Sequence, residues 1–384
     1  MKALVLSGGG ARGAYQAGAM LAVAEVAERL KTPHPIQIFT GVSAGAINAG
    51  FLAAGAEDFL GAAQKLVTLW SNLKSDKVFR TDAVSFGKIG LSWMGELSLG
   101  GLAGGKRHAH SLLDTSPLLQ LLRENIEFSQ IQKNIDSDII HATAISALDY
   151  KTNETITFVQ GRPEIKLWRR ARRSAEKTLL EAEHILASSA IPILFQPAQV
   201  GARHFGDGCV RNGMPLSPAL HLGASSLLVI GVRQWDQDLT MRVDLQTEVS
   251  EPSIARIANV LLNSVLLDSI ETDLERLEKI NQFLQKIPTD LHTGLNFKPV
   301  SYVSIHPSQD IGAIAARMSS RLPRIVRYLL KGLGPLDDAS ELISYLLFEP
   351  DFCQKLIEMG YQDGQKQKEH IENFFETPVA KGLP

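Results

Sequence analysis

Two glycine-rich segments near the start of the chain carry residue types suited to attack on a carbonyl carbon. They read Gly8-Gly9-Gly10-Ala11-Arg12-Gly13 and Gly41-Val42-Ser43-Ala44-Gly45. The second has the G-x-S-x-G spacing of a nucleophile elbow, in which the glycines permit the strained turn that lifts a serine Oγ out of the fold. The first would gather backbone N–H groups at a helix N-terminus, where negative charge is stabilised, including that of a transient oxyanion. Ser43 is therefore the candidate nucleophile.

The first segment also satisfies the G-x-G-x-x-G dinucleotide fingerprint. That interpretation requires an acidic residue at the end of the second strand, where it would hold ribose hydroxyls. The expected second strand instead ends in Gly41-Val42-Ser43, and Glu25 and Glu28 lie on the helix before it. The missing acid argues against a nucleotide, and the oxyanion interpretation is preferred.

A serine nucleophile needs a base, and two arrangements are open. Asp207, between Gly206 and Gly208 after a short expected strand, is the candidate carboxylate, although an Asp among glycines is most often a turn residue. His306 follows another expected strand and would complete an ordinary Ser43-Asp207-His306 triad. A loop histidine without a catalytic role is the plainer interpretation of His306.

The elements around these residues predict an α/β fold. Residues 3–7 and 36–42 read as buried strands, each followed by a helical pattern, at 11–30 and 46–54. Parallel strands of such a unit end at one edge of the sheet, so the two glycine segments are expected side by side. Further strands are expected at 139–148, 154–160, 199–205, 226–232 and 300–305, and further helices at 176–189, 252–287 and 311–375.

The character of the chain changes after Trp235. We predict a catalytic domain at 1–235 and a mostly helical C-terminal region at 236–384. Between residues 76 and 110, glycines alternate with large apolar residues and are followed by a short basic run. This stretch is either a cap or lid over the site, touching anionic headgroups, or an ordinary packed insertion.

Composition limits the classes of function. Of 384 residues, 39 are Lys or Arg and 41 are Asp or Glu, giving a formal net charge of −2. That balance makes nucleic acid an improbable partner. The two cysteines, Cys209 and Cys353, cannot form a disulfide framework, and with no apolar run of signal-peptide or membrane-spanning length the expected location is the cytoplasm, with peripheral membrane contact at most.

Taken together, the motifs resemble those of the patatin-like phospholipase family. The resemblance rests on the glycine loop, the elbow, the run Ala187-Ser188-Ser189-Ala190-Ile191-Pro192, and Asp207-Gly208 with Asn212 and Pro215 downstream. These occur in the family's order and cover roughly residues 3 to 220. One departure exists: the family's Asp-Gly-Gly or Asp-Gly-Ala is Asp207-Gly208-Cys209 here, and we expect the small cysteine to be tolerated by packing.

The resemblance implies a three-layer α/β sandwich with a mainly parallel central sheet. It implies a Ser43-Asp207 dyad acting on ester bonds of lipids, without a histidine and without metal or organic cofactor. The oxyanion hole would be lined by backbone N–H groups of Gly8, Gly9, Gly10, Arg12 and Gly13, while Gly41 and Gly45 shape the elbow. Two alternatives remain: a non-catalytic lipid-binding protein of the same fold, and a hydrolase with the triad that includes His306.

Overall fold

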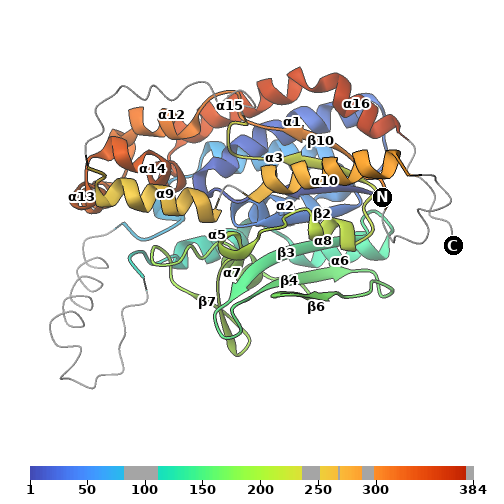
Figure 1. Ribbon diagram of the computed structural model, residues 1–384, viewed down its shortest axis with the longest axis horizontal. Coiled ribbons are helices and arrows are strands. Elements are labelled where there is room, and N and C mark those ends of the chain that lie inside the picture. The colour runs from blue at the N-terminus through green and yellow to red at the C-terminus, as the bar shows by residue number, and fades with distance from the viewer. Residues whose placement is uncertain (82–110, 236–250, 267–268, 288–297, 378–384) are drawn as a thin grey trace.

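The computed structural model describes residues 1–81, 111–235, 251–266, 269–287 and 298–377. At its centre is a ten-stranded sheet, in which β10-β9-β1-β2-β3 are neighbours and run parallel. These strands are β1 Lys2–Leu6, β2 Ile38–Val42, β3 Ala142–Asp149, β9 Ser226–Ile230 and β10 Ser301–Ile305. The predicted α/β class with a mainly parallel sheet is confirmed (Figure 1).

Beyond β3 the sheet is mixed, with antiparallel pairings and a parallel pairing of β4 with β6. β4 Glu154–Gly161 runs antiparallel to β3 and continues to β6 Arg173–Lys177 and β5 Arg169–Arg170. β8 Arg203–Asp207 pairs antiparallel with both β3 and β7 Ala198–Val200. The register sets Asp207 opposite Ala147, close to the carboxyl end of β3. The candidate carboxylate thereby reaches the sheet edge at which β1 and β2 also end.

Alternating side chains of the strands enter two separate cores, which makes three layers. Leu4 and Leu6 of β1 face one core, whereas Ala3 and Val5 face the other. The first core is covered by helices α1 Gly13–Arg29, α2 Ala44–Ala54, α3 Phe59–Ser71, α5 Ser116–Asn125, α6 Phe128–Asp136, α7 Ala182–Ser188, α15 Pro350–Lys366 and α16 Lys368–Glu376. The second is covered by α8 Ser217–His221 and α10 Ser269–Gln285.

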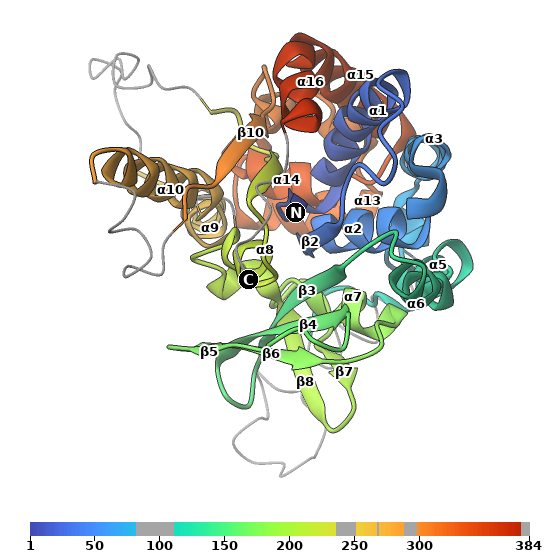
Figure 2. The ribbon, with the colours of Figure 1, turned by 90° about the vertical axis from the view of Figure 1, so that its right-hand side faces the viewer.

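The C-terminal part of the chain packs onto the N-terminal part. Its further helices are α9 Ile254–Leu266, α12 Ile311–Arg317, α13 Arg324–Leu333 and α14 Ser340–Leu346. Helix α15 lies along α1 so closely that a Cβ at Gly360 would lie 2.0 Å from the Tyr15 carbonyl oxygen (Figure 2). Residues on both sides of position 235 thus share one sheet and one core. The domain boundary itself stays a prediction.

Three expectations about elements need comment. The helix expected at 176–189 begins only at Ala182, because residues 173–177 pair with β4 as strand β6. The helix expected at 252–287 is helical at 254–266 (α9) and 269–285 (α10), and residues 267–268 between them lie outside the described residues. Most of the expected lid at 76–110 lies outside the described residues, and before that gap Val78 and Phe79 are buried. No helix within the described ranges is long and apolar enough to cross a membrane.

Candidate active site

Ser43 stands at the junction of β2 and α2 in a strained backbone conformation. Its φ is 55° and its ψ −126°, a region that side-chain-bearing residues seldom occupy. The turn is tight on both sides: a Cβ at Gly41 would lie 2.2 Å from the Gly45 carbonyl oxygen, and one at Gly45 would lie 2.3 Å from that of Leu6. The two glycines of the G-x-S-x-G pattern are therefore required by the close approach of backbone to backbone.

A second serine holds the elbow in place. The Ser43 backbone N–H donates to Ser188 Oγ at 2.9 Å, and the Ser188 hydroxyl donates to the Ser146 carbonyl oxygen at 2.6 Å. Ser188 is fully buried at the end of α7. It belongs to the run 187–192 on which the family resemblance partly rests, but no sequence pattern predicts this contact. Ser188 thus links the elbow to strand β3.

Asp207 lies beside Ser43 at the end of β8 and is almost fully buried, with 1% of its surface exposed. Its backbone N–H donates to the Ala190 carbonyl oxygen at 2.8 Å, and its Oδ1 accepts the Cys209 backbone N–H at 2.8 Å. Burial raises the pKa of Asp207 to about 6, while hydrogen bonds from the Ser43 side chain and from Cys209 act to lower it. The structure therefore brings the two candidate residues of the dyad into direct contact.

Cys209 fits between Asp207 and the glycine loop. A Cβ at Gly8 would lie 2.3 Å from Cys209 Sγ and 2.8 Å from Ser43 Cβ, so the loop, the cysteine and the serine are in close contact. Burial, and to a smaller extent the nearby Asp207 carboxylate, raises the pKa of the Cys209 thiol well above its usual range. The thiol is thus held neutral, and it donates a hydrogen bond to Asp207.

The backbone N–H groups of the glycine loop divide into two sets. Those of Arg12 and Gly13 bond within the 3-10 turn Gly10–Arg12, the first to the Gly9 carbonyl oxygen at 3.1 Å. The Gly8 N–H donates to Cys209. The N–H groups of Gly9 and Gly10 have no hydrogen-bond partner within the described part of the chain. Gly10 also has a φ of 57° and borders the same pocket as Ser43.

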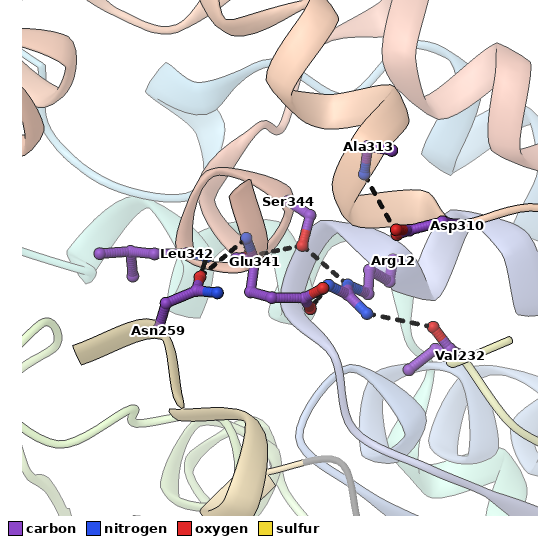
Figure 3. A network of polar contacts seen from close by, with 8 residues as sticks. All are labelled: Arg12, Val232, Asn259, Asp310, Ala313, Glu341, Leu342 and Ser344. Carbon is purple, nitrogen blue, oxygen red and sulfur yellow. Dashed lines mark hydrogen bonds and ion pairs between the residues drawn. The ribbon is translucent and has the colours of Figure 1, made fainter. Parts of the chain in front are cut away.

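The Arg12 side chain is held by residues from the far end of the chain (Figure 3). It is 2% exposed, forms an ion pair with Glu341 and donates from Nε to Ser344 Oγ at 2.8 Å. Its guanidinium lies 5.2 Å from the centre of the Tyr345 ring. Sequence reasoning assigned no role to these three residues of α14, because nothing local marks residues about 330 positions apart as neighbours.

An apolar pocket borders Ser43. Its walls come from α2, α3, α5 and the segments around Val78, Ile191 and Phe348, so both the N-terminal and the C-terminal parts contribute. The lining residues are Gly10, Ser43, Ala44, Ile47, Leu69, Trp70, Leu73, Val78, Leu118, Leu121, Ser189, Ile191, Phe195 and Phe348. Such a lining suits a hydrocarbon chain.

The remaining candidates fall in two places. Gly208, Asn212 and Pro215 are buried in the turn after Asp207, where the Asn212 N–H donates to the Cys209 carbonyl oxygen at 3.2 Å. His306 packs on the Trp235 ring and lies 4.0 Å from Glu271, and burial lowers its pKa to about 4. None of its contacts with described residues is to Ser43 or Asp207.

The fold and site define an α/β protein in which a serine, Ser43, lies at a strained strand-to-helix turn and is hydrogen-bonded to a buried carboxylate, Asp207. The family model of patatin-like phospholipase matches residues 4–220, more than half of the chain, so the chain belongs to this family, as its motifs predicted. No curated protein matches the sequence.

The solved structures that are similar to this chain include those of three proteins. Human GIVD cytosolic phospholipase A2 in complex with methyl gamma-linolenyl fluorophosphonate has 12% identity and a TM-score of 0.43, covering 98% of this chain and 59% of its own. The type III effector protein ExoU of Pseudomonas aeruginosa has 15% identity and a TM-score of 0.36, and the match covers 96% of this chain and 53% of ExoU. VipD from Legionella pneumophila has 13% identity and a TM-score of 0.30, and the match covers 79% of this chain and 61% of VipD. The chain thus spans about half to three fifths of the length of these proteins.

Proposed function

We propose that this protein hydrolyses carboxylic ester bonds of lipids, with phospholipids or lysophospholipids as substrates, through Ser43 and Asp207. The observation that carries the proposal is the hydrogen bond between the strained Ser43 and the buried Asp207. A carboxylate is a weak base in water, but desolvation strengthens it, and a pKa of about 6 leaves Asp207 ionised at neutral pH.

In the proposed reaction, Ser43 Oγ attacks the ester carbonyl carbon as its proton passes to Asp207. The resulting oxyanion lies against the glycine loop, and we assign its donors to the N–H groups of Gly9 and Gly10, which have no hydrogen-bond partner among the described residues. Arg12 and Gly13, whose N–H groups already bond within the turn, would shape the loop. Collapse releases the alcohol, which takes the proton from Asp207, and water then cleaves the acyl-enzyme in the same way.

The apolar pocket beside Ser43 supports a lipid as the acyl donor. A fatty acyl chain held among Leu69, Leu73 and Phe195 would place its carbonyl at Ser43, next to Gly10. The surroundings of His306 favour the dyad over the triad, because the histidine is engaged elsewhere and its low pKa makes it a poor base.

The test is ester hydrolysis by the full chain and by Ser43→Ala, Asp207→Asn and His306→Gln. We expect Ser43→Ala to lower kcat by about ten-thousandfold and Asp207→Asn by about a hundredfold or more, with His306→Gln close to wild type per folded molecule. An inactive but folded His306→Gln would favour the triad. If the wild type neither hydrolyses any acyl ester nor reacts at Ser43 with a fluorophosphonate, a non-catalytic lipid-binding role is the better description.

A further inference from the structure

Helix α9 carries four large apolar side chains on the outside of the molecule. Ile254, Ile257, Val260 and Leu261 are all exposed, although a surface helix normally directs such a stripe into the core. Their spacing of three and four residues places them along one side of the helix. Scattered exposed apolar residues are ordinary, whereas a contiguous stripe marks a surface that meets an apolar environment.

The inner side of α9 is polar and fixed to α14 and the turn before it. Asn259 Oδ1 accepts the backbone N–H groups of Glu341 and Leu342 at 3.0 and 3.4 Å (Figure 3). The Ser253 hydroxyl donates to Asp338 at 2.6 Å, and Arg256 lies 3.4 Å from the same carboxylate. These contacts determine which side of α9 faces outward, so the exposed stripe is a property of the folded chain.

Helix α13 adjoins α9 and also exposes a large apolar side chain. Its C-terminus meets the N-terminus of α9, since a Cβ at Gly334 would lie 2.8 Å from Ser253 Oγ. Val326 and Leu330 face inward, whereas Tyr328, 76% exposed, and Leu333 are on the surface. We call Ile254, Ile257, Val260, Leu261 and Tyr328 the outer face.

The charged residues within α9 and α13 themselves are all basic. Helices α9 and α13 carry four basic residues, Arg256, Arg324, Arg327 and Lys331, and no acidic residue. Arg324 and Lys331 are exposed and form no ion pair within the described ranges of the chain. Apolar side chains flanked by unpaired cations suit an anionic lipid surface, in which the cations meet phosphate and the apolar groups enter the acyl boundary.

The outer face lies at the same end of the molecule as the candidate active site. Helix α9 packs against the turn 208–211, directly after Asp207, and against α14, whose Tyr345 backbone touches Gly10. In Figure 1, α9, α13 and α14 are grouped at the left end. A membrane bound there would be close to Ser43.

We propose that the outer face of α9 and α13 is a docking surface for a phospholipid membrane bearing anionic headgroups. The proposal extends the proposed lipid hydrolysis by naming the surface through which the enzyme reaches its substrate. Binding and hydrolysis are separable, however, because docking does not require the Ser43 hydroxyl.

The test is sedimentation of the full-length Ser43→Ala protein with vesicles of phosphatidylcholine alone or mixed with phosphatidylserine. We expect binding to strengthen with phosphatidylserine and to weaken with salt. The double variant Ile257→Asp with Leu261→Asp should bind vesicles about a hundredfold more weakly, since each substitution removes one apolar side chain that would be buried in the membrane. The matched control is Leu179→Asp, because Leu179 is 64% exposed and Leu261 61%, and Leu179 lies between β6 and α7. The control should bind like its parent.

A second double variant tests the basic side chains of α13 and leaves the apolar side chains unchanged. Arg324→Gln with Lys331→Gln should weaken binding to the anionic vesicles by about tenfold or more, whereas Lys65→Gln with Lys355→Gln, exposed residues of α3 and α15, should not. Equal binding by the outer-face variants and their controls would overturn the proposal. The proposal would also be overturned if the wild type were a dimer and the double variant Ile257→Asp with Leu261→Asp were a monomer that still bound vesicles normally. In that case a second copy of the chain would cover this face.

The two proposals fail separately in one further comparison. With Ser43 intact, the Ile257→Asp and Leu261→Asp protein should hydrolyse a soluble short-chain ester at the wild-type rate but lose activity on vesicles. Failure of the wild type on the soluble ester counts against the proposed function alone, and the sedimentation result still decides the docking surface.

Discussion

Arg12 of the glycine loop forms a buried ion pair with Glu341, which lies 329 residues further along the chain. The pair joins the loop proposed to stabilise the oxyanion to helix α14, outside the range 4–220 matched by the family model. The same helix touches Gly10 through the Tyr345 backbone. The C-terminal part of the chain is thus a structural component of the site, and not merely an appendage to it.

The first prediction concerns the energy of this ion pair. Glu341→Gln should destabilise the protein by about 3 kcal/mol, because it leaves the Arg12 guanidinium buried without its counter-charge. In a double-mutant cycle with Arg12→Met, Glu341→Gln should lower the free energy of unfolding much less in the Arg12→Met protein than in the wild type. Urea denaturation of the four proteins measures the coupling. The exposed pair Arg29–Glu372 is the control and should couple by less than about 1 kcal/mol; equal coupling in both pairs would contradict a special role for Glu341.

The second prediction is the pH dependence of hydrolysis. Asp207 accepts a proton only as the carboxylate, and burial raises its pKa to about 6. The value of kcat/KM for an uncharged ester should therefore rise with pH between about 5 and 7 and then level off. His306→Gln should leave that midpoint unchanged, because burial lowers the pKa of His306 to about 4. A midpoint that moves in His306→Gln would be inconsistent with the dyad.

The third prediction is that the buried carboxylate lowers stability at neutral pH. The folded-state pKa of Asp207, about 6, lies above its unfolded value of 3.8, so the unfolded chain loses its proton first and stability falls as pH rises from about 3.8 to about 6. Asp207→Asn cannot ionise and escapes this loss. Its stability relative to wild type should improve by about 2 kcal/mol between pH 4.5 and pH 7.5. Urea denaturation at the two pH values checks this, and a pH-independent difference would argue against the raised pKa.

Much of the fold followed from the sequence because the signals were local. The strands around Leu4, Phe39 and Leu228 are continuous apolar runs, and their burial on both faces fixed them in the sheet. The helix expected at 176–189 was partly wrong, since pairing with β4 turned residues 173–177 into a strand, and tertiary pairing overrides local pattern.

The candidate site divides in the same way. Ser43 and Asp207 stand in motifs that glycine spacing makes visible, and the structure places them together. Ser188, Glu341 and Tyr345 contact the elbow or the loop from distant parts of the chain. Their residue types are common, so only the folded chain identifies their neighbours.

The fourth prediction compares two glycines of very different surroundings. Gly10→Ala should be inactive and less stable, because φ is 57° there and a Cβ would lie 2.4 Å from the Tyr345 carbonyl oxygen. Gly213→Ala is the matched control, since no heavy atom lies within 4 Å of its added Cβ. It should keep wild-type activity and melting temperature. Ester hydrolysis and thermal unfolding measure both variants, and an active Gly10→Ala would show that the loop tolerates displacement.

The fifth prediction concerns Cys209, the residue at which this chain departs from the family pattern. Its thiol is buried, and burial with the nearby Asp207 carboxylate raises its pKa, so it should resist alkylation in the folded protein. Cys209→Ala removes one hydrogen bond to Asp207 and should retain activity within about tenfold, with the pH midpoint moved upward because that bond lowers the Asp207 pKa.

A larger side chain at this position should act through the glycine loop. Cys209 Sγ already occupies the space that a Cβ at Gly8 would need, and Ser43 Cβ lies on the same side. Cys209→Leu should therefore displace the loop from the elbow and abolish hydrolysis, while Cys353→Leu, a buried control in α15, should affect stability alone. Activity per folded molecule separates the two variants. If Cys209→Ala were as inactive as Ser43→Ala, the thiol would have a chemical role beyond packing.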